Sequence, residues 1–162
     1  MVLQYFKEKE KIEKSIAKDI YKNILKKSNY LLINNNYFVE KNYKSSFEIV
    51  SILIILYIKY NIRNKIKNAK AINQELIDLF ISDLDESLRT KGIGDMSIGK
   101  YVKSYVKKFY FRLSRFNIDL DDLNINFFED YLANFDFIIK GHESSAAKSF
   151  YNFSKKISNS FK

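Results

Sequence analysis

The stretch "DLDESLRTKGIGDMSIGK", residues 83–100, holds three of the four glycines in the chain. Apolar residues recur at helical spacing on both sides of it, which indicates a helix before it and another after it. Arg89 and Lys91 place positive charge where the first of these helices would end, and Gly92 suits the left-handed position that commonly follows a helix. The stretch therefore predicts a Gly-containing helix–corner–helix at residues 83–116.

The residues after Gly92 form the second half of this expected corner. Gly94 allows another sharp change of direction, and Asp95 or Ser97 can cap the helix that follows. Gly99 falls in the first turn of that helix, where a glycine is costly unless another group packs close to it. We therefore expect a tightly built connection between two packed helices.

Two catalytic interpretations of the stretch are weaker. A phosphate-binding loop needs a different glycine spacing after a strand, and Asp95 would put negative charge where a phosphate sits. Asp83 and Asp85 are two residues apart and do not share a helix face. Asp83 and Glu86 are neighbours on a helix, but two acids alone usually form a solvated face. We expect no bound nucleotide, no metal ion and no cofactor here.

The composition of the 162-residue chain favours long helices. Proline is absent, glycine is scarce and 46% of the residues are hydrophobic, which argues against disorder and against a turn-rich β-sandwich. Cysteine is absent and His142 is the only histidine, so disulfides, thiolate metal sites and most histidine acid–base schemes are excluded. We expect one all-α domain over residues 1–162, a bundle of about five to six helices.

The first two helices are expected near the N-terminus. Residues 28–46, rich in Asn and Tyr, suggest an irregular connection between them. Ser45 or Ser46 can cap the second helix, which contains the apolar run "FEIVSILIILYI" at residues 47–58. That run is shorter than the roughly 20 residues of a membrane span, so it predicts a helix at the centre of a bundle. The first helix, within residues 8–27, has isoleucines at steps of four, which predicts their burial: Ile12, Ile16, Ile20 and Ile24.

The later helices follow from the same spacing. Asn73 is the expected N-cap of the third helix, Asp119–Asp122 can start a fifth, and Ser144 or Ser145 can start a last one. In the fourth helix, Tyr101, Tyr105 and Phe111 fall outside the main core stripe, and three lysines form a basic edge. The expected core stripe of that helix is Val102, Val106, Phe109, Tyr110 and Leu113, and the basic edge is Lys100, Lys103 and Lys107.

The net charge of +9 is distributed in blocks. Residues 59–70 and 100–115 are basic without an acid, whereas residues 119–136 are acidic without a base. We expect part of this charge to cancel between packed helices, and the remainder favours an anionic partner such as a membrane surface, a nucleic acid or a ribosome. The N-terminus shows no secretory signal, so we expect a soluble protein facing the cytoplasm.

Residues 83–112 resemble the signature of the ubiquinol–cytochrome c chaperone family, which reads approximately D-x-D-x-x-L-R-E-x-G-V-G-D, then G-K-x-x-K, then F-Y-x-R. Thr90 and Ile93 depart mildly from that pattern. The matching residues are Asp83, Asp85, Leu88, Arg89, Gly92, Gly94, Asp95, Gly99, Lys100, Lys103, Phe109, Tyr110 and Arg112.

The resemblance implies an assembly chaperone without catalysis. Its members bind newly made cytochrome b and help it enter the cytochrome bc1 complex, respiratory complex III. Expected partners are nascent or newly inserted cytochrome b, a ribosome or a small partner subunit, and an anionic membrane, with no specific DNA. The expected location is cytoplasmic and peripheral to the inner membrane, or the matrix side in a mitochondrion.

Within the signature, we assign two sets of residues. The first set is expected to hold the corner in shape, and the second to contact the client or a partner. The structural set is Asp83, Asp85, Leu88, Gly92, Gly94, Asp95, Gly99, Phe109 and Tyr110. The contact set is Arg89, Lys100, Tyr101, Lys103, Tyr105, Lys107 and Arg112. The alternative function is a basic helical module that binds nucleic acid or the ribosome, although the acidic blocks oppose it.

Overall fold

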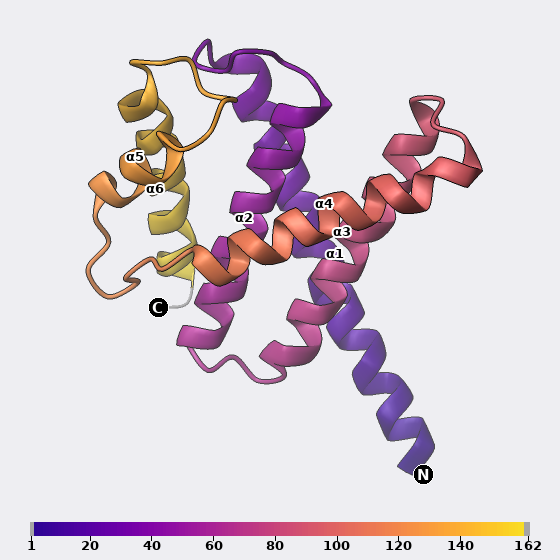
Figure 1. The fold of residues 1–162 in the computed structure, drawn as a ribbon. Coiled ribbons are helices and arrows are strands. Elements are labelled where there is room, and N and C mark those ends of the chain that lie inside the picture. Colours follow the sequence, from indigo (N-terminus) through magenta and orange to yellow (C-terminus); the bar gives the residue numbers. More distant parts are fainter. Residues whose placement is uncertain (1, 161–162) are drawn as a thin grey trace. The chain divides into compact units, whose positions relative to one another are not determined.

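The computed structural model describes residues 2–160, and their side chains between residues 11 and 159. Within residues 2–160 the chain forms six α-helices and no β-strand, which confirms the all-α fold class (Figure 1). The helices are α1 (Val2–Asn34), α2 (Tyr43–Arg63), α3 (Ala69–Thr90), α4 (Asp95–Arg115), α5 (Ile125–Leu132) and α6 (Glu143–Ser160).

The helices belong to two compact units. The first unit consists of the chain up to Lys22 together with Lys67–Asn117, so it contains the N-terminal part of α1, all of α3 and all of α4. The second consists of Asn23–Ile66 and the chain from Ile118 onward, so it contains the rest of α1, α2, α5 and α6. The single domain expected over residues 1–162 stays a prediction.

In the first unit, α3 packs against α4 through aromatic side chains. The rings of Phe80 and Phe109 lie with their centroids 5.2 Å apart, and both side chains are almost fully buried. Leu84 and Leu88 continue the buried face of α3, as the helical spacing predicted. The hydroxyl of Tyr21 in α1 donates to the Asp83 carboxylate at 2.6 Å, which ties α1 to α3.

In the second unit, α2 is the core helix. By length and composition it could cross a membrane, but 78% of its apolar window is buried inside the protein, as expected for the centre of a bundle. It packs against α6, where the Tyr60 and Ser154 hydroxyls lie 3.3 Å apart. The α1–α2 connection pairs with the α5–α6 connection through a single β-bridge between Phe38 and Ile138.

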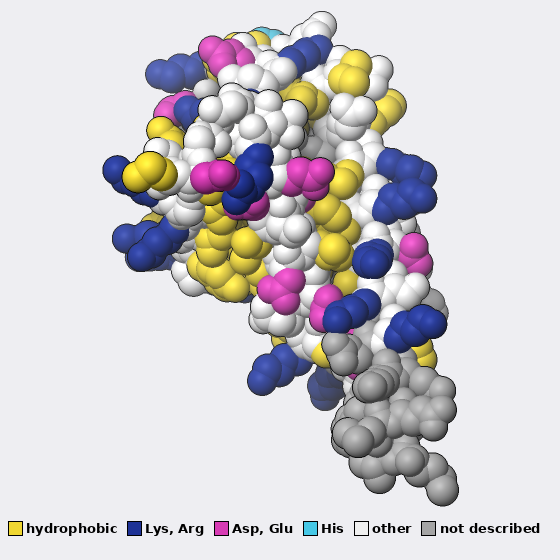
Figure 2. Space-filling model, turned by 90° about the vertical axis from the view of Figure 1, so that its right-hand side faces the viewer, with side chains coloured by type: hydrophobic (Ala, Val, Ile, Leu, Met, Phe, Trp, Pro, Cys, Tyr) yellow, Lys and Arg dark blue, Asp and Glu magenta, His cyan; other side chains and the backbone are white. Residues whose placement is uncertain are grey.

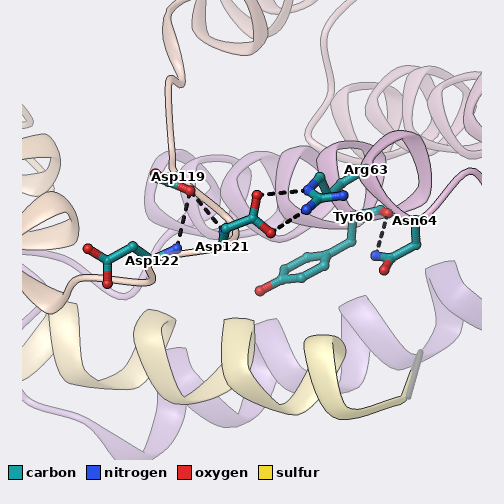
Figure 3. A network of polar contacts seen from close by, with 6 residues as sticks. All are labelled: Tyr60, Arg63, Asn64, Asp119, Asp121 and Asp122. Carbon is teal, nitrogen blue, oxygen red and sulfur yellow. Dashed lines mark hydrogen bonds and ion pairs between the residues drawn. The ribbon is translucent and has the colours of Figure 1, made fainter.

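An ion pair in the second unit joins the basic and acidic blocks of the sequence. The Arg63 guanidinium donates to both carboxylate oxygens of Asp121 (Figure 3). The distance from Arg63 Nε to Asp121 Oδ2 is 3.1 Å. This hydrogen bonding raises the pKa of Arg63, and backbone N–H donors from Asp121 and Asp122 lower the pKa of Asp119. Asn64 closes the end of α2 by donating to the Tyr60 carbonyl. The expected cancellation of charge between blocks therefore occurs at this place.

The buried face of α1 differs from the predicted one. Ile12 and Ile16 are 60% and 41% exposed, while Glu13 and Ala17 are buried in their place. A step of four residues overshoots one helical turn by about 40°, so three such steps carry an isoleucine about 120° around the helix. Ile24 is fully buried, and the earlier isoleucines have rotated away from the core. The helix also continues to Asn34 through residues predicted as irregular.

The predicted starts of four helices are also wrong, and α6 begins at Glu143, so that Ser144 and Ser145 lie inside it. Asn42 caps α2, its side chain accepting from the Ser45 N–H at 3.2 Å. The N-cap of α3 is Asn68, five residues before Asn73, because the chain turns at Lys65 and Asn68 with positive φ angles of 49° and 62°. Asp119 accepts N–H groups in a turn, and α5 begins only at Ile125.

Candidate functional site: the α3–α4 corner and the exposed face of α4

The corner between α3 and α4 closes as a Schellman motif. The Gly92 N–H donates to the Arg89 carbonyl at 2.8 Å, and the Ile93 N–H donates to the Leu88 carbonyl at 3.3 Å. Gly92 has φ of +82°, the left-handed region that favours glycine. The half-buried Ile93 follows the buried Leu88 by five residues, as this motif commonly requires. The predicted role of Gly92 is confirmed.

Arg89 bridges the two helices across this corner. Its Nε donates to the Asp85 carboxylate at 2.6 Å within α3, and its Nη1 donates to the Asp95 carboxylate at the start of α4. The hydrogen bond to Asp85 is the main cause that raises the pKa of Arg89, and burial of the guanidinium opposes it. Since Arg89 donates to two carboxylates, it joins the end of α3 to the start of α4, and its expected contact with a client stays a prediction.

Asp83 and Asp85 of α3 are held by different partners. Asp83 accepts from Tyr21 and Asp85 accepts from Arg89, so the two carboxylates have separate partners. Among residues with described side chains, no group of three or more acids and histidines is arranged to hold a metal ion. The only histidine, His142, lies exposed before α6.

The other two glycines of the corner have different surroundings from those expected. Gly94 is the N-cap of α4 with an extended backbone, φ −66° and ψ 151°, which any residue adopts. A Cβ atom on Gly94 or on Gly99 would meet nothing within 4 Å. Gly99 therefore lacks the close packing that would explain it. Asp95 and Ser97 lie within α4, and the predicted capping by either residue is wrong.

The exposed side of α4 combines basic and apolar side chains. Residues three or four apart lie on one helix face, so the three lysines of the predicted basic edge share a face with Met96, Tyr110 and Phe111. These apolar side chains are 102%, 44% and 61% exposed. The burial of Phe109 turns the next residue, Tyr110, outward, and its predicted place in the core stripe is wrong. We call this surface the α4 face: Met96, Lys100, Lys103, Lys107, Tyr110 and Phe111.

The surface of the molecule shows the same mixture. In Figure 2, exposed hydrophobic side chains lie between lysine and arginine side chains on the face displayed. At the C-terminal end of α4, the Arg115 guanidinium lies 5.4 Å from the Phe111 ring centre, which adds a cation–π contact beside the α4 face. A partner for this surface would need apolar groups together with negative charge.

Three of the expected contact residues lie along another edge of α4. Tyr101, Tyr105 and Arg112 follow one another at steps of four and seven residues, so they share a helix edge, and the helical rotation separates this edge from the lysine row. Burial, and secondarily Tyr101, raises the pKa of Tyr105, whose ring lies 6.0 Å from the Lys108 ammonium. Tyr101 is exposed and Arg112 is half-buried. The seven expected contact residues therefore divide between the corner, the α4 face and this second edge.

The sequence comparison with known families agrees with the fold. The family described as ubiquinol–cytochrome c chaperone matches residues 35–154, which include the corner and the α4 face. The chain therefore belongs to the ubiquinol–cytochrome c chaperone family, and the predicted family is confirmed.

A solved structure supports this assignment. The chain is similar to the structure described as the Cbp3 homolog from Brucella abortus, with 25% identity and a TM-score of 0.71. The alignment covers 97% of this chain and 88% of that chain. The search of curated proteins gave no match.

Proposed function

We propose that this chain is a non-catalytic assembly chaperone, which binds newly synthesised cytochrome b and promotes assembly of the cytochrome bc1 complex. The α4 face would be the surface that contacts the client. The observation that carries this proposal is one exposed helix face that holds Met96, Tyr110 and Phe111 together with three lysines. Membership of the chaperone family supports the general class of function.

The chemistry of the α4 face suits a membrane-protein client. Transmembrane segments expose apolar side chains before they are assembled, and Met and aromatic side chains adapt to such surfaces. Burial of apolar area contributes about 25 cal/mol per Å², which favours covering side chains as exposed as Met96 and Phe111. Lysines attract the anionic headgroups that surround a newly inserted segment. We therefore propose a location on the cytoplasmic or matrix side, peripheral to the inner membrane.

The client is identified by capture of the tagged protein from gently solubilised cells of its own host. Enrichment of cytochrome b over other abundant membrane proteins is the expected result of mass spectrometry. Recovery of a small subunit or ribosomal proteins beside cytochrome b would identify the further partners of the chaperone. If cytochrome b is not enriched while other proteins are, the proposed client is wrong.

The lysine row of α4 also favours a second candidate function, a basic module that binds RNA or the ribosome. Three lysines at helical spacing neutralise phosphates without reading sequence. Filter binding of the purified chain to ribosomal RNA at two salt concentrations tests this candidate. Binding that weakens steeply with salt, together with capture of ribosomes but no cytochrome b, would favour it over the chaperone.

A further inference from the structure

A pocket in the second unit is lined by several lysines that have no acidic partner within residues 11–159. Its volume is about 580 Å³, and it is lined by faces of α1, α2 and α6. Lys26 and Lys27 from α1 and Lys156 from α6 line this pocket, and each carries an ammonium group at the end of its side chain. Among the residues with described side chains, none of the three forms an ion pair with an acid.

The interior side of the pocket is apolar. Phe153 and Ile157 are 8% and 3% exposed, and Tyr57 meets Phe153 edge to face with ring centroids 5.9 Å apart. Asn23 and Asn152 add amide groups to the lining. The pocket therefore joins an aromatic and aliphatic floor to a cationic and amide rim.

The positive charges of the lysines that line the pocket repel one another, which is unfavourable without an anion between them. Burial and the neighbouring Lys156 both lower the pKa of Lys27, and burial has the larger effect. The Lys27 ammonium lies 5.1 Å from the Tyr30 ring centre, a cation–π contact that compensates only part of the charge. An anion between the lysines would remove their repulsion and accept charge-assisted hydrogen bonds.

We propose that this pocket binds an amphiphilic anion, a phosphate or carboxylate group attached to an apolar body. The anionic group would lie among Lys26, Lys27 and Lys156, and the apolar body would lie on Tyr57, Phe153 and Ile157. The volume falls within the range of about 300–1,000 Å³ that is usual for small-molecule sites. The same chemistry belongs to single-chain lipids and to compact soluble aromatic phosphates. The inference is independent of cytochrome b binding, because its residues belong to the second unit.

Isothermal titration calorimetry with the purified full chain tests the site, using decyl phosphate, phenyl phosphate, inorganic phosphate and neutral decyl glucoside. Decyl phosphate or phenyl phosphate should bind at least about tenfold more tightly than either inorganic phosphate or decyl glucoside. Only the two organic phosphates carry both an anionic group and an apolar body. Preference for decyl phosphate indicates a lipid source, and preference for phenyl phosphate indicates a soluble one. No binding of either, or equal binding of inorganic phosphate, overturns the proposal.

Two variants of α6 separate the pocket from general charge. Lys156→Gln removes an ammonium group from the pocket, whereas Lys155→Gln removes the same charge from the adjacent exposed residue, whose ammonium lies over the Tyr151 ring instead. Lys156→Gln should weaken decyl or phenyl phosphate binding about tenfold, the usual order for a lost charge-assisted hydrogen bond, and Lys155→Gln should leave it unchanged. Equal losses in both variants would show attraction to net charge alone, and the pocket assignment would be wrong. Both substitutions are at exposed positions, and equal melting temperatures confirm that both variants fold.

Discussion

The guanidinium of Arg89 in α3 donates to the carboxylate of Asp95 in α4, so this ion pair crosses the glycine corner. The same guanidinium donates to Asp85 one helical turn earlier in α3. These exposed contacts set the angle of the corner more than they add to global stability, because exposed ion pairs are screened by water.

Replacing Arg89 with Gln should therefore loosen the corner without unfolding the protein. We expect faster hydrogen exchange at residues 91–97, because neither carboxylate is held once the guanidinium is gone. The matched control is Arg63→Gln, which breaks the comparable pair with Asp121 in the second unit. Fast exchange at the corner in both variants, or in neither, would contradict the proposed role of Arg89.

The three glycines of the corner should differ in their tolerance of alanine. Gly92→Ala should cost about 1–2 kcal/mol, because an L-residue is strained at its φ of +82°. Gly94→Ala should be tolerated, and Gly99→Ala should stabilise α4 by about 0.5–1 kcal/mol, since no atom lies within 4 Å of either added Cβ. Chemical denaturation of the three variants measures these changes. A loss at Gly94 or Gly99 as large as at Gly92 would show that the corner needs glycine for another reason.

The α4 face should lose its client when its most exposed ring is replaced. Phe111→Gln should reduce the cytochrome b recovered with the tagged protein by about tenfold, because an aromatic contact in an interface is often worth more than 1 kcal/mol. The control is Val39→Gln, which makes a similar change at a side chain that is 55% exposed in the second unit. Unchanged recovery with Phe111→Gln would exclude this part of α4 from the client contact.

The protein should lose stability in alkaline solution as tyrosines of the second unit ionise on unfolding. Burial raises the pKa of Tyr57 and of Tyr37 above the ordinary value of 10.0. The unfolded chain therefore releases these protons first, and the free energy of unfolding falls as the pH rises from about 10 through the higher folded pKa values.

Tyr57→Phe should flatten this alkaline decline. Urea denaturation at a series of pH values from neutral to strongly alkaline compares the variant with the unaltered protein. The stability of the unaltered protein should fall below that of the variant as the pH rises above about 10, because the variant has no proton to release at this position. Curves that stay parallel would show that Tyr57 does not contribute.

The corner was predictable from sequence because its determinants are local. The helix end, the left-handed Gly92 and the pairing of Asp85 with Arg89 each involve residues at most five apart. The pairing of Arg89 with Asp95 was missed, although a basic and an acidic residue on either side of Gly92 gave a signal. The family signature directed attention to the same residues.

Other features depended on how helices rotate and turn. Steps of four residues exceed one helical turn, so Ile12 and Ile16 lie outside the buried face of α1. The chain turns at Lys65 and Asn68, which have positive φ angles, and α3 therefore begins before its predicted start. Met96 was missed because it lies between Asp95 and Ser97, the two residues expected to cap α4, and was therefore not assigned to the exposed face of the helix. The lysine-lined pocket had no sequence signal, because three helices distant in the chain build it.

The division of α1 between the two units affects the order in which the chain can fold during synthesis. Residues up to Lys22 belong with α3 and α4, whereas the part of α1 from Asn23 belongs with α2, α5 and α6. A ribosome must deliver residues through Asn117 before the first unit has all its parts, and must deliver α6 before the second does. Long-range closure of this kind is slow compared with local helix formation. The apolar α2 is therefore synthesised well before its partner α6, and its apolar side chains lack this partner through most of translation. During that period the nascent chain is itself exposed to aggregation.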